Sequence, residues 1–145
     1  MRSILALVLL SVPAALVADD KKPADADAKA MVGKYGVMKA ELGGKDLTEP
    51  LKVLKFEITE GGKYTASHGE EIDAGTFTLD PTKTPKTMDV KPTGGPLKGK
   101  LVKAIYKLDG DILTICYDHN AGDRPTAFES KPDTTTLLVA YKRAK

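Results

Sequence analysis

The feature that most constrains the fold is an alternation of apolar and polar residues that recurs from about residue 32 onward. In "LKVLKFEIT", residues 51–59, the apolar Leu54, Phe56 and Ile58 fall on one face, and a lysine and a glutamate fall on the other. A period of two residues is the signature of a β-strand with one buried face. No later window of 12 or more residues keeps the apolar stripe of a helix. We therefore expect an all-β domain.

Turn residues divide this region into eight to ten short strands. Gly61 and Gly62 form one such turn, and Asp109, Gly110 and Asp111 interrupt the clearest hairpin. A series of strands without a long crossover favours a small antiparallel up-and-down barrel, because closure removes the exposed strand edges. A two-sheet sandwich is the alternative. The segments with the strand pattern are residues 51–59, 61–67, 71–81, 87–92, 101–118, 124–130 and 134–143.

The first eighteen residues, "MRSILALVLLSVPAALVA", have the layout of a secretory signal peptide. A basic residue, Arg2, precedes an apolar run from Ile4 to Val12, and small residues stand before the charged "DDKK". A membrane anchor is the alternative, but Ile4 to Ala18 is only 15 residues, whereas a bilayer core needs roughly 20. We expect residues 1–18 to be removed and the mature protein to be periplasmic or secreted, without a membrane span.

The next segment, "DDKKPADADAKA" at residues 19–30, is charged, alanine-rich and without an apolar period. We expect a disordered spacer, although a short helical turn there is compatible with the sequence. Residues 31–145 are expected to form one domain, because about 115 residues can bury one core but not two.

The composition excludes several classes of protein. The formal net charge is +2, and the 22 basic and 20 acidic residues are interspersed, so we expect no nucleic-acid partner. The single cysteine, Cys116, cannot form an internal disulfide. The glycines of "GGPLKGK", residues 94–100, lack the spacing of a phosphate-binding loop and are expected in a connection. We expect no cofactor, no bound metal and a monomer.

Five segments occur in a fixed order along the chain: "VGKYGVMKAELGGKDL", "AGTFTLDPTKTPKTMDV", "GPLKGKLVKAIYKLDGDILTICYD", "DRPTAFESKPDT" and "LLVAYKR". In this order they resemble a family of uncharacterised exported bacterial domains, best known from planctomycetes and regarded as lipocalin-like. The resemblance covers residues 31–143. It implies a small antiparallel barrel and no established activity.

The resemblance also implies one structural contact. The family usually opens with Gly, any residue and Trp, whereas this chain has Gly33, Lys34 and Tyr35. In lipocalins an arginine of the last strand covers the opening Trp at the closed end of the barrel, and by analogy Arg143 covers Tyr35. A guanidinium over an aromatic face gains about 0.5 to 2 kcal/mol, and the gain should be smaller with Tyr than with Trp.

The stretch "CYDHNAGDRPTAF", residues 116–128, gathers several reactive side chains. Cys116 and His119 could act as nucleophile and base. Three residues apart at the end of a strand, however, their side chains point to opposite sides. We therefore assign no catalytic residue and expect Cys116 to be a small packing residue.

The same stretch suggests calcium, because Asp118, Asn120, Asp123 and Glu129 carry oxygen ligands. The glycine stands one place early for a calcium loop, and a turn between two strands explains the same residues. His68, beside two glutamates at a hairpin tip, is a weak metal signal that a solvated turn also explains.

Two hypotheses for the function remain, besides the disfavoured enzyme. In the first, an exported non-enzymatic barrel binds a small apolar molecule, with Phe56, Tyr64, Phe77 and Tyr106 facing the interior. Arg124 then lies at the rim, where it binds loop carbonyls or clamps an anion. In the second, the same side chains fill the barrel, and the domain is a non-catalytic structural or protein-interaction domain of the cell envelope.

Overall fold

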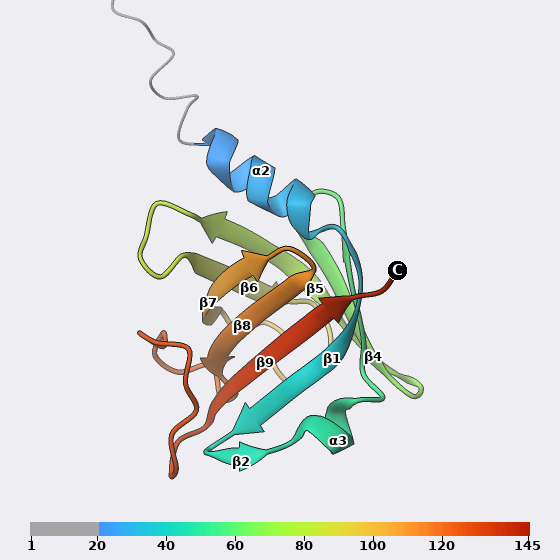
Figure 1. The fold of residues 1–145 in the computed structure, drawn as a ribbon, viewed down its shortest axis with the longest axis vertical. Helices are drawn as coiled ribbons and strands as arrows, with labels where there is room; N and C mark the ends of the chain where they lie inside the picture. Colours follow the sequence, from blue (N-terminus) through green and yellow to red (C-terminus); the bar gives the residue numbers. More distant parts are fainter. Residues whose placement is uncertain (1–20) are drawn as a thin grey trace, which may run out of the picture.

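The structure is a computed structural model, and it describes residues 21–145. The predicted signal peptide, residues 1–18, lies outside the described residues. Nine antiparallel strands follow one another in a single sheet (Figure 1). They are β1 (Gly33–Leu42), β2 (Lys45–Asp46), β3 (Lys55–Thr59), β4 (Lys63–His68), β5 (Glu71–Asp80), β6 (Thr87–Pro92), β7 (Val102–Asp109), β8 (Ile112–Asp118) and β9 (Thr136–Arg143).

The sheet closes because β1 also pairs with β9, from Tyr35 opposite Arg143 to Leu42 opposite Leu137. Eight strands form the barrel, and the short β2 pairs only with β1. This pairing confirms the predicted all-β, lipocalin-like up-and-down barrel and excludes the two-sheet sandwich. Residues 94–100 form the predicted connection, between β6 and β7.

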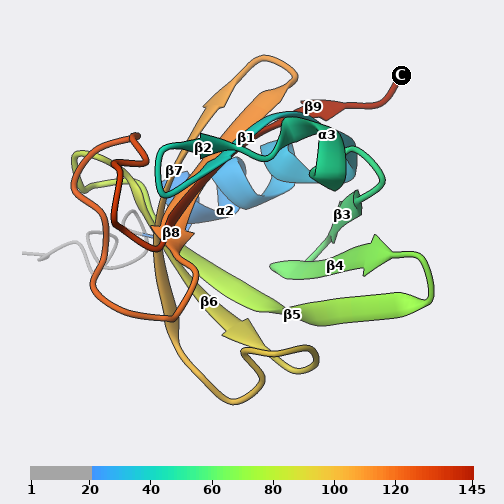
Figure 2. The same cartoon turned by 90° about the horizontal axis from the view of Figure 1, so that it is seen from below.

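One end of the barrel is covered by a helix, α2 (Lys21–Met31) (Figures 1 and 2). Met31 is fully buried in the barrel core, and its carbonyl accepts a hydrogen bond from the Tyr35 hydroxyl at 2.7 Å. The expectation of a disordered spacer over residues 19–30 differs from the structure, in which residues 21–30 form most of α2. The helix is held on the barrel by hydrogen bonds from barrel side chains. Contacts of this kind do not require an apolar stripe in the sequence of the helix, so the sequence pattern did not reveal it.

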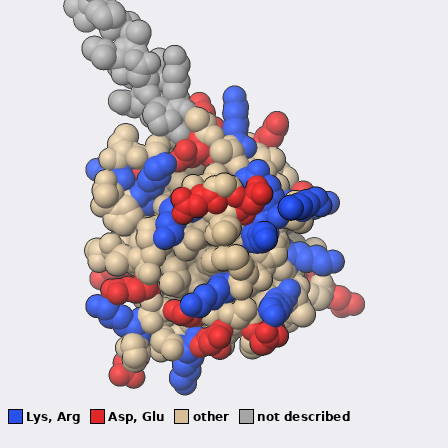
Figure 3. Space-filling view, viewed as in Figure 1, with Lys and Arg blue, Asp and Glu red and all other residues tan. Residues whose placement is uncertain are grey.

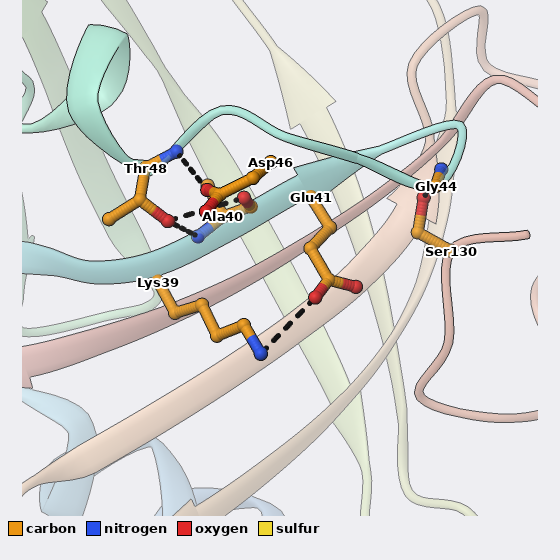
Figure 4. Close-up of polar contacts among 7 residues, drawn as sticks. All are labelled: Lys39, Ala40, Glu41, Gly44, Asp46, Thr48 and Ser130. Atoms are coloured by element: carbon orange, nitrogen blue, oxygen red, sulfur yellow. Dashed lines mark hydrogen bonds and ion pairs between the residues drawn. The ribbon is translucent and has the colours of Figure 1, made fainter.

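The segment that follows β1 is fastened by polar contacts (Figure 4). The Thr48 hydroxyl accepts a hydrogen bond from the Ala40 N–H at 3.0 Å, and the Thr48 N–H donates to the Asp46 carboxylate at 2.8 Å. These contacts fix the start of the short helix α3 (Thr48–Leu51). The Gly44 N–H donates to the Ser130 hydroxyl at 3.2 Å, which ties the β1–β2 turn to the loop before β9.

The barrel interior is a single apolar core built from alternate residues of each strand. Phe56 stacks on Tyr141 with ring centroids 4.6 Å apart, and Tyr35 lies 6.2 Å from Phe56. Burial of each large apolar side chain stabilises the fold by about 1.5 to 3 kcal/mol. The buried members of the core are Met31, Tyr35, Val37, Ala40, Phe56, Ile58, Phe77, Met88, Ala104, Tyr106, Leu113, Ile115, Leu137, Val139 and Tyr141.

Residues 119–135 form a long loop that folds over the outer face of β7 and β8. Ile105 and Cys116 face outward from these strands, and yet both are buried. The expectation of a strand over residues 124–130 is wrong, because this segment belongs to the loop. β8 pairs with β9 along its whole length, so the closed barrel offers this segment no free edge.

Candidate functional site

The four side chains expected to line the barrel interior are found on its inner side. Phe56, Phe77 and Tyr106 are 9%, 7% and 1% exposed, and all three belong to the core. Tyr64 is partly buried and packs against the core, with its ring 6.0 Å from that of Phe56. Phe56, Phe77 and Tyr106 are therefore part of the packed core, whereas Tyr64 is only partly buried, and a binding site must be sought where the inner wall meets open space.

At the end covered by α2, Arg143 lies over the ring of Tyr35, with its Cζ 5.4 Å from the ring centroid. Its guanidinium donates hydrogen bonds to the Tyr35 hydroxyl at 2.9 Å and to the Ala30 carbonyl of α2. Arg143 Nε is buried without a hydrogen-bond partner, 3.9 Å from the Asp111 carboxylate. Burial raises the pKa of Tyr35 above its ordinary value. The pair therefore links β1, β9 and α2, and its role is structural.

Asp27 of α2 supplies the second attachment of the helix. Its carboxylate accepts a hydrogen bond from the Tyr106 hydroxyl at 2.7 Å and an ion-pair contact from Lys86 at 3.1 Å. Burial, followed by this hydrogen bond, raises the pKa of Tyr106 far above its ordinary value. A side chain expected to line a ligand cavity is thus engaged in holding α2 on the barrel.

A groove of about 670 Å³ separates α2 from β5 and from the β3–β4 turn. Ala24 and Ala28 lie one helical turn apart, and their small side chains leave space opposite Phe77 and Leu79. Both of these β5 residues belong to the inward-facing set, so the groove reaches the inner wall of the barrel. Its full lining is Ala24, Asp25, Ala28, Lys29, Val32, Glu60, Gly61, Gly62, Phe77, Thr78 and Leu79.

The β3–β4 turn bounds the groove because Gly62 lies directly against β5. The Phe77 N–H donates to the Gly62 carbonyl at 2.8 Å. Gly62 has a φ of +70°, and a Cβ at this position would lie 2.6 Å from the Phe77 carbonyl oxygen. Glycine tolerates this positive φ and has no Cβ to collide with β5. It therefore allows the turn to approach β5 closely.

Arg124 anchors the long loop to the barrel wall. Its guanidinium donates hydrogen bonds to the carbonyls of Ala104 at 2.7 Å and Met88 at 3.3 Å, and it contacts the Asp89 carboxylate at 2.5 Å. A second hollow, of about 560 Å³, lies beside it, between the loop and the β5–β6 turn. Since the guanidinium is already occupied by two carbonyls and a carboxylate, the geometry favours the loop-binding interpretation over an anion clamp.

The structure does not bring Cys116 and His119 together. Cys116 is fully buried, and its thiol faces the carbonyls of Ala127 at 3.7 Å and Glu129 at 3.8 Å. Burial raises the pKa of the thiol, which opposes formation of the reactive thiolate. His119 is exposed on the loop and its N–H donates to the Thr135 carbonyl. This arrangement is that of a packing residue beside a turn.

The expected turn after β8 is formed around Asp118. Its carboxylate accepts hydrogen bonds from the Thr135 hydroxyl at 2.6 Å and from the Asn120 N–H at 2.8 Å. These hydrogen bonds, that of Thr135 first, lower the pKa of Asp118. Asp123 and Glu129 lie farther along the loop and are exposed. Within residues 21–145, neither this turn nor His68 at the end of β4 belongs to a group of side chains arranged to hold a metal ion.

Four residues that sequence analysis did not combine stand at inward-facing strand positions: Asp73 of β5 and Tyr64 of β4, which are neighbours on one face of this strand pair, Tyr117 of β8 and Tyr141 of β9. Burial raises the pKa of Tyr64 to about 12, with a further contribution from the charge of Asp73. The pKa of Tyr117 also rises to about 12, because of burial and then because of Tyr64 and Asp73. Asp73 lies on the same face of β5 as Gly75 and Phe77, because alternate residues of a strand share a face. An acidic residue at an inward-facing position is the feature by which the sequence could have revealed this cluster.

On the face shown in Figure 3, basic and acidic side chains alternate without a large patch of one sign. Neither helix in the described part of the chain is both long and apolar enough to cross a membrane. Comparison with family models, with curated proteins and with solved structures gives no match for this chain.

Proposed function

We propose that this chain is an exported, non-enzymatic, lipocalin-like domain that binds a small, mainly apolar molecule in the groove between α2 and β5. The observation that carries the proposal is the groove itself. Its volume of about 670 Å³ lies within the range of about 300 to 1,000 Å³ that is usual for ligand sites. Phe77 and Leu79 form its inner wall, and Phe77 is one of the residues nominated from sequence.

The lining indicates the shape of the ligand. Apolar contacts come from both sides, with Ala24 and Ala28 on α2 and Phe77 and Leu79 on β5. Charged side chains are confined to the helix and the turn, where Asp25, Lys29 and Glu60 are exposed. A molecule with an apolar body and one polar end fits this distribution, because the body loses contact with water and the polar end keeps it.

Binding can be tested with N-phenylnaphthylamine, an apolar fluorophore whose emission rises in an apolar site. Ala28→Leu fills the groove and should weaken binding about tenfold. Ala26→Leu is the matched control, since Ala26 belongs to the same helix, is exposed and does not line the groove. Equal binding by the wild type and both variants would place the fluorophore elsewhere and contradict the site.

Native mass spectrometry of the protein purified from its own host asks whether a natural ligand is carried. A retained small molecule that is lost in the Ala28→Leu variant would support the proposal. The signal-peptide pattern of residues 1–18 supports export, and the five ordered segments between residues 31 and 143 support membership of the planctomycete family. Amino-terminal sequencing of the exported protein should begin at Asp19.

A solid-core interaction domain is the second candidate, and the packing of Phe56 and Tyr106 in the core favours it. It predicts that repeated preparations carry no small molecule and that the fluorophore does not bind. In that case the domain would act in the cell envelope through its loops.

A further inference from the structure

An acidic side chain lies on the inner side of the barrel without a partner. Asp73 is half-buried at an inward-facing position of β5, and among the side chains that the structure describes, those of residues 24–145, its carboxylate has no ion-pair or hydrogen-bond partner. A carboxylate withdrawn from water is costly unless a cation or donors compensate it. Arg143 is the only lysine or arginine at an inward-facing strand position, and it is bound to Tyr35 and α2.

The β6–β7 connection is folded closely onto this carboxylate. The Thr93 and Gly94 N–H groups both donate to the Ala74 carbonyl, at 2.7 and 3.3 Å, and so hold the connection on β5. Gly95 follows with a φ of +82°, and a Cβ there would lie 2.1 Å from Asp73 Oδ1. Glycine at this position therefore leaves the space that the carboxylate occupies.

Aromatic side chains surround the same region from three strands. Tyr64 lies across Gly75, its partner on β5, where a Cβ would be 2.8 Å from the Tyr64 hydroxyl. Tyr117 of β8 and Tyr141 of β9 face the same interior, because their strand partners Leu137 and Leu113 are core residues. Phe56 lies between Tyr64 and Tyr141, with ring distances of 6.0 and 4.6 Å.

The three hydroxyls remain available. Among the described residues none of them has a hydrogen-bond partner, and Arg143 Nε is the only fully enclosed side-chain nitrogen or oxygen without one. Tyr64 and Tyr117 are half-buried and keep some contact with solvent, whereas Tyr141 is buried. Tyrosine hydroxyls ionise near pH 10 even when exposed, and burial raises the pKa of these three further. At neutral pH they therefore offer π-faces and neutral oxygens rather than phenolate ligands.

We propose that Asp73, Tyr64, Tyr117 and Tyr141 form a binding site for an organic ammonium ion. The carboxylate would supply the compensating charge, and the ring faces would attract the cation and accept its aliphatic or aromatic body. An anion is disfavoured by Asp73, and a hard metal ion by the single carboxylate. This site shares no residue with the groove between α2 and β5, and so it goes beyond the function proposed above.

The test uses three molecules of nearly equal size, phenethylamine, phenethyl alcohol and phenylacetate, titrated by calorimetry. The amine is expected to bind, the alcohol to bind more weakly and the carboxylate not to bind. Asp73→Asn, which preserves shape, should weaken amine binding about tenfold. Asp109→Asn is the matched control, since Asp109 is an exposed carboxylate at the β7–β8 turn. Equal amine binding by both variants, equal binding of amine and phenylacetate, or no amine binding would overturn the proposal.

Tyr64 provides a second, independent set of variants. Tyr64→Phe keeps the ring face and should retain most of the amine affinity, whereas Tyr64→Leu should lose it about fivefold. Equal amine affinity of the two variants would show that the aromatic ring of Tyr64 does not contribute to binding. The groove variant Ala28→Leu should leave amine binding unchanged, so that failure of one site is distinguished from failure of the other.

Discussion

The guanidinium of Arg143 covers the ring of Tyr35, and the two residues stand opposite each other where the last strand pairs with the first. The Tyr35 hydroxyl receives a hydrogen bond from Arg143 and donates one to the Met31 carbonyl. One pair of side chains therefore stabilises both the closure of the barrel and the attachment of α2.

Arg143→Ala is expected to lower the free energy of unfolding by about 2 kcal/mol, because it removes a cation–π contact and a charged hydrogen bond. Urea denaturation followed by circular dichroism measures the change. Lys142→Ala is the control, since Lys142 is the exposed neighbour on the same strand, and it should change stability by less than about 0.5 kcal/mol. An equal, small effect of both variants would show that the contact does not contribute.

Tyr106→Phe should loosen α2, because it deletes the hydrogen bond to Asp27 while keeping the buried ring. A hydrogen bond to a charged group contributes about 1.5 to 3 kcal/mol. Hydrogen exchange should then show faster exchange of the α2 amides, together with a small loss of global stability. Tyr64→Phe is the control, since the described residues offer its hydroxyl no partner. Unchanged exchange in Tyr106→Phe would mean that Met31 and Arg143 suffice to hold the helix.

The strands of the barrel could be predicted from sequence because each strand has one apolar face. Phe56, Phe77 and Tyr106 were placed on the inner side by alternation alone, and they lie there. In a closed up-and-down barrel, strands that are consecutive in the sequence form hydrogen bonds with each other. Once periodicity and turn residues locate the strands, the topology therefore follows as well.

The parts that could not be predicted depend on contacts between distant residues. The helix α2 is held by Tyr106 and Arg143, which follow it by more than 70 positions. Residues 124–130 have the residues of a strand but no free edge to pair with. Between Val37 and Lys39 the register of β1 against β9 shifts, and such a bulge changes the inward parity without a distinct sequence signal.

The candidate sites were only partly accessible to sequence reasoning. Phe77 was nominated and lines the groove, but the other wall belongs to α2, which was expected to be disordered. Arg124 was nominated as a rim residue and is engaged with the barrel wall. Asp73 could have been found, since the alternation that places Gly75 and Phe77 inside also places Asp73 there.

All five tyrosines have a raised pKa in the folded domain, with burial as the first cause in each. Unfolded tyrosines ionise near 10. The folded state therefore holds these protons more tightly, and the stability that they contribute is complete below about pH 10 and falls as the pH rises beyond it. Stability should decrease between about pH 10 and 12.

Tyrosinate absorbance measures this directly, and no tryptophan interferes because the chain has none. We expect no tyrosine to ionise near pH 10 while the fold is intact, and a cooperative step at higher pH that coincides with loss of the β-sheet signal. A tyrosine that ionises reversibly near pH 10 in the folded domain would show that its side chain is not buried as described.

Cys116 reports on the loop that Arg124 anchors. Its thiol is fully buried beneath the Ala127 and Glu129 carbonyls, and burial raises its pKa. A thiol reagent can therefore reach Cys116 only when the loop opens, and the rate of labelling measures the population of the open loop.

Arg124→Ala removes the hydrogen bonds to Ala104 and Met88 and the contact with Asp89. Labelling of Cys116 should become at least about tenfold faster, since each lost charged hydrogen bond contributes about 1.5 to 3 kcal/mol. Asp123→Ala, an exposed change at the neighbouring position, should leave the rate unchanged. Circular dichroism should remain that of a folded barrel in both variants, because the core does not include the loop. Equal labelling of the two variants would show that the loop is held by its other contacts rather than by Arg124.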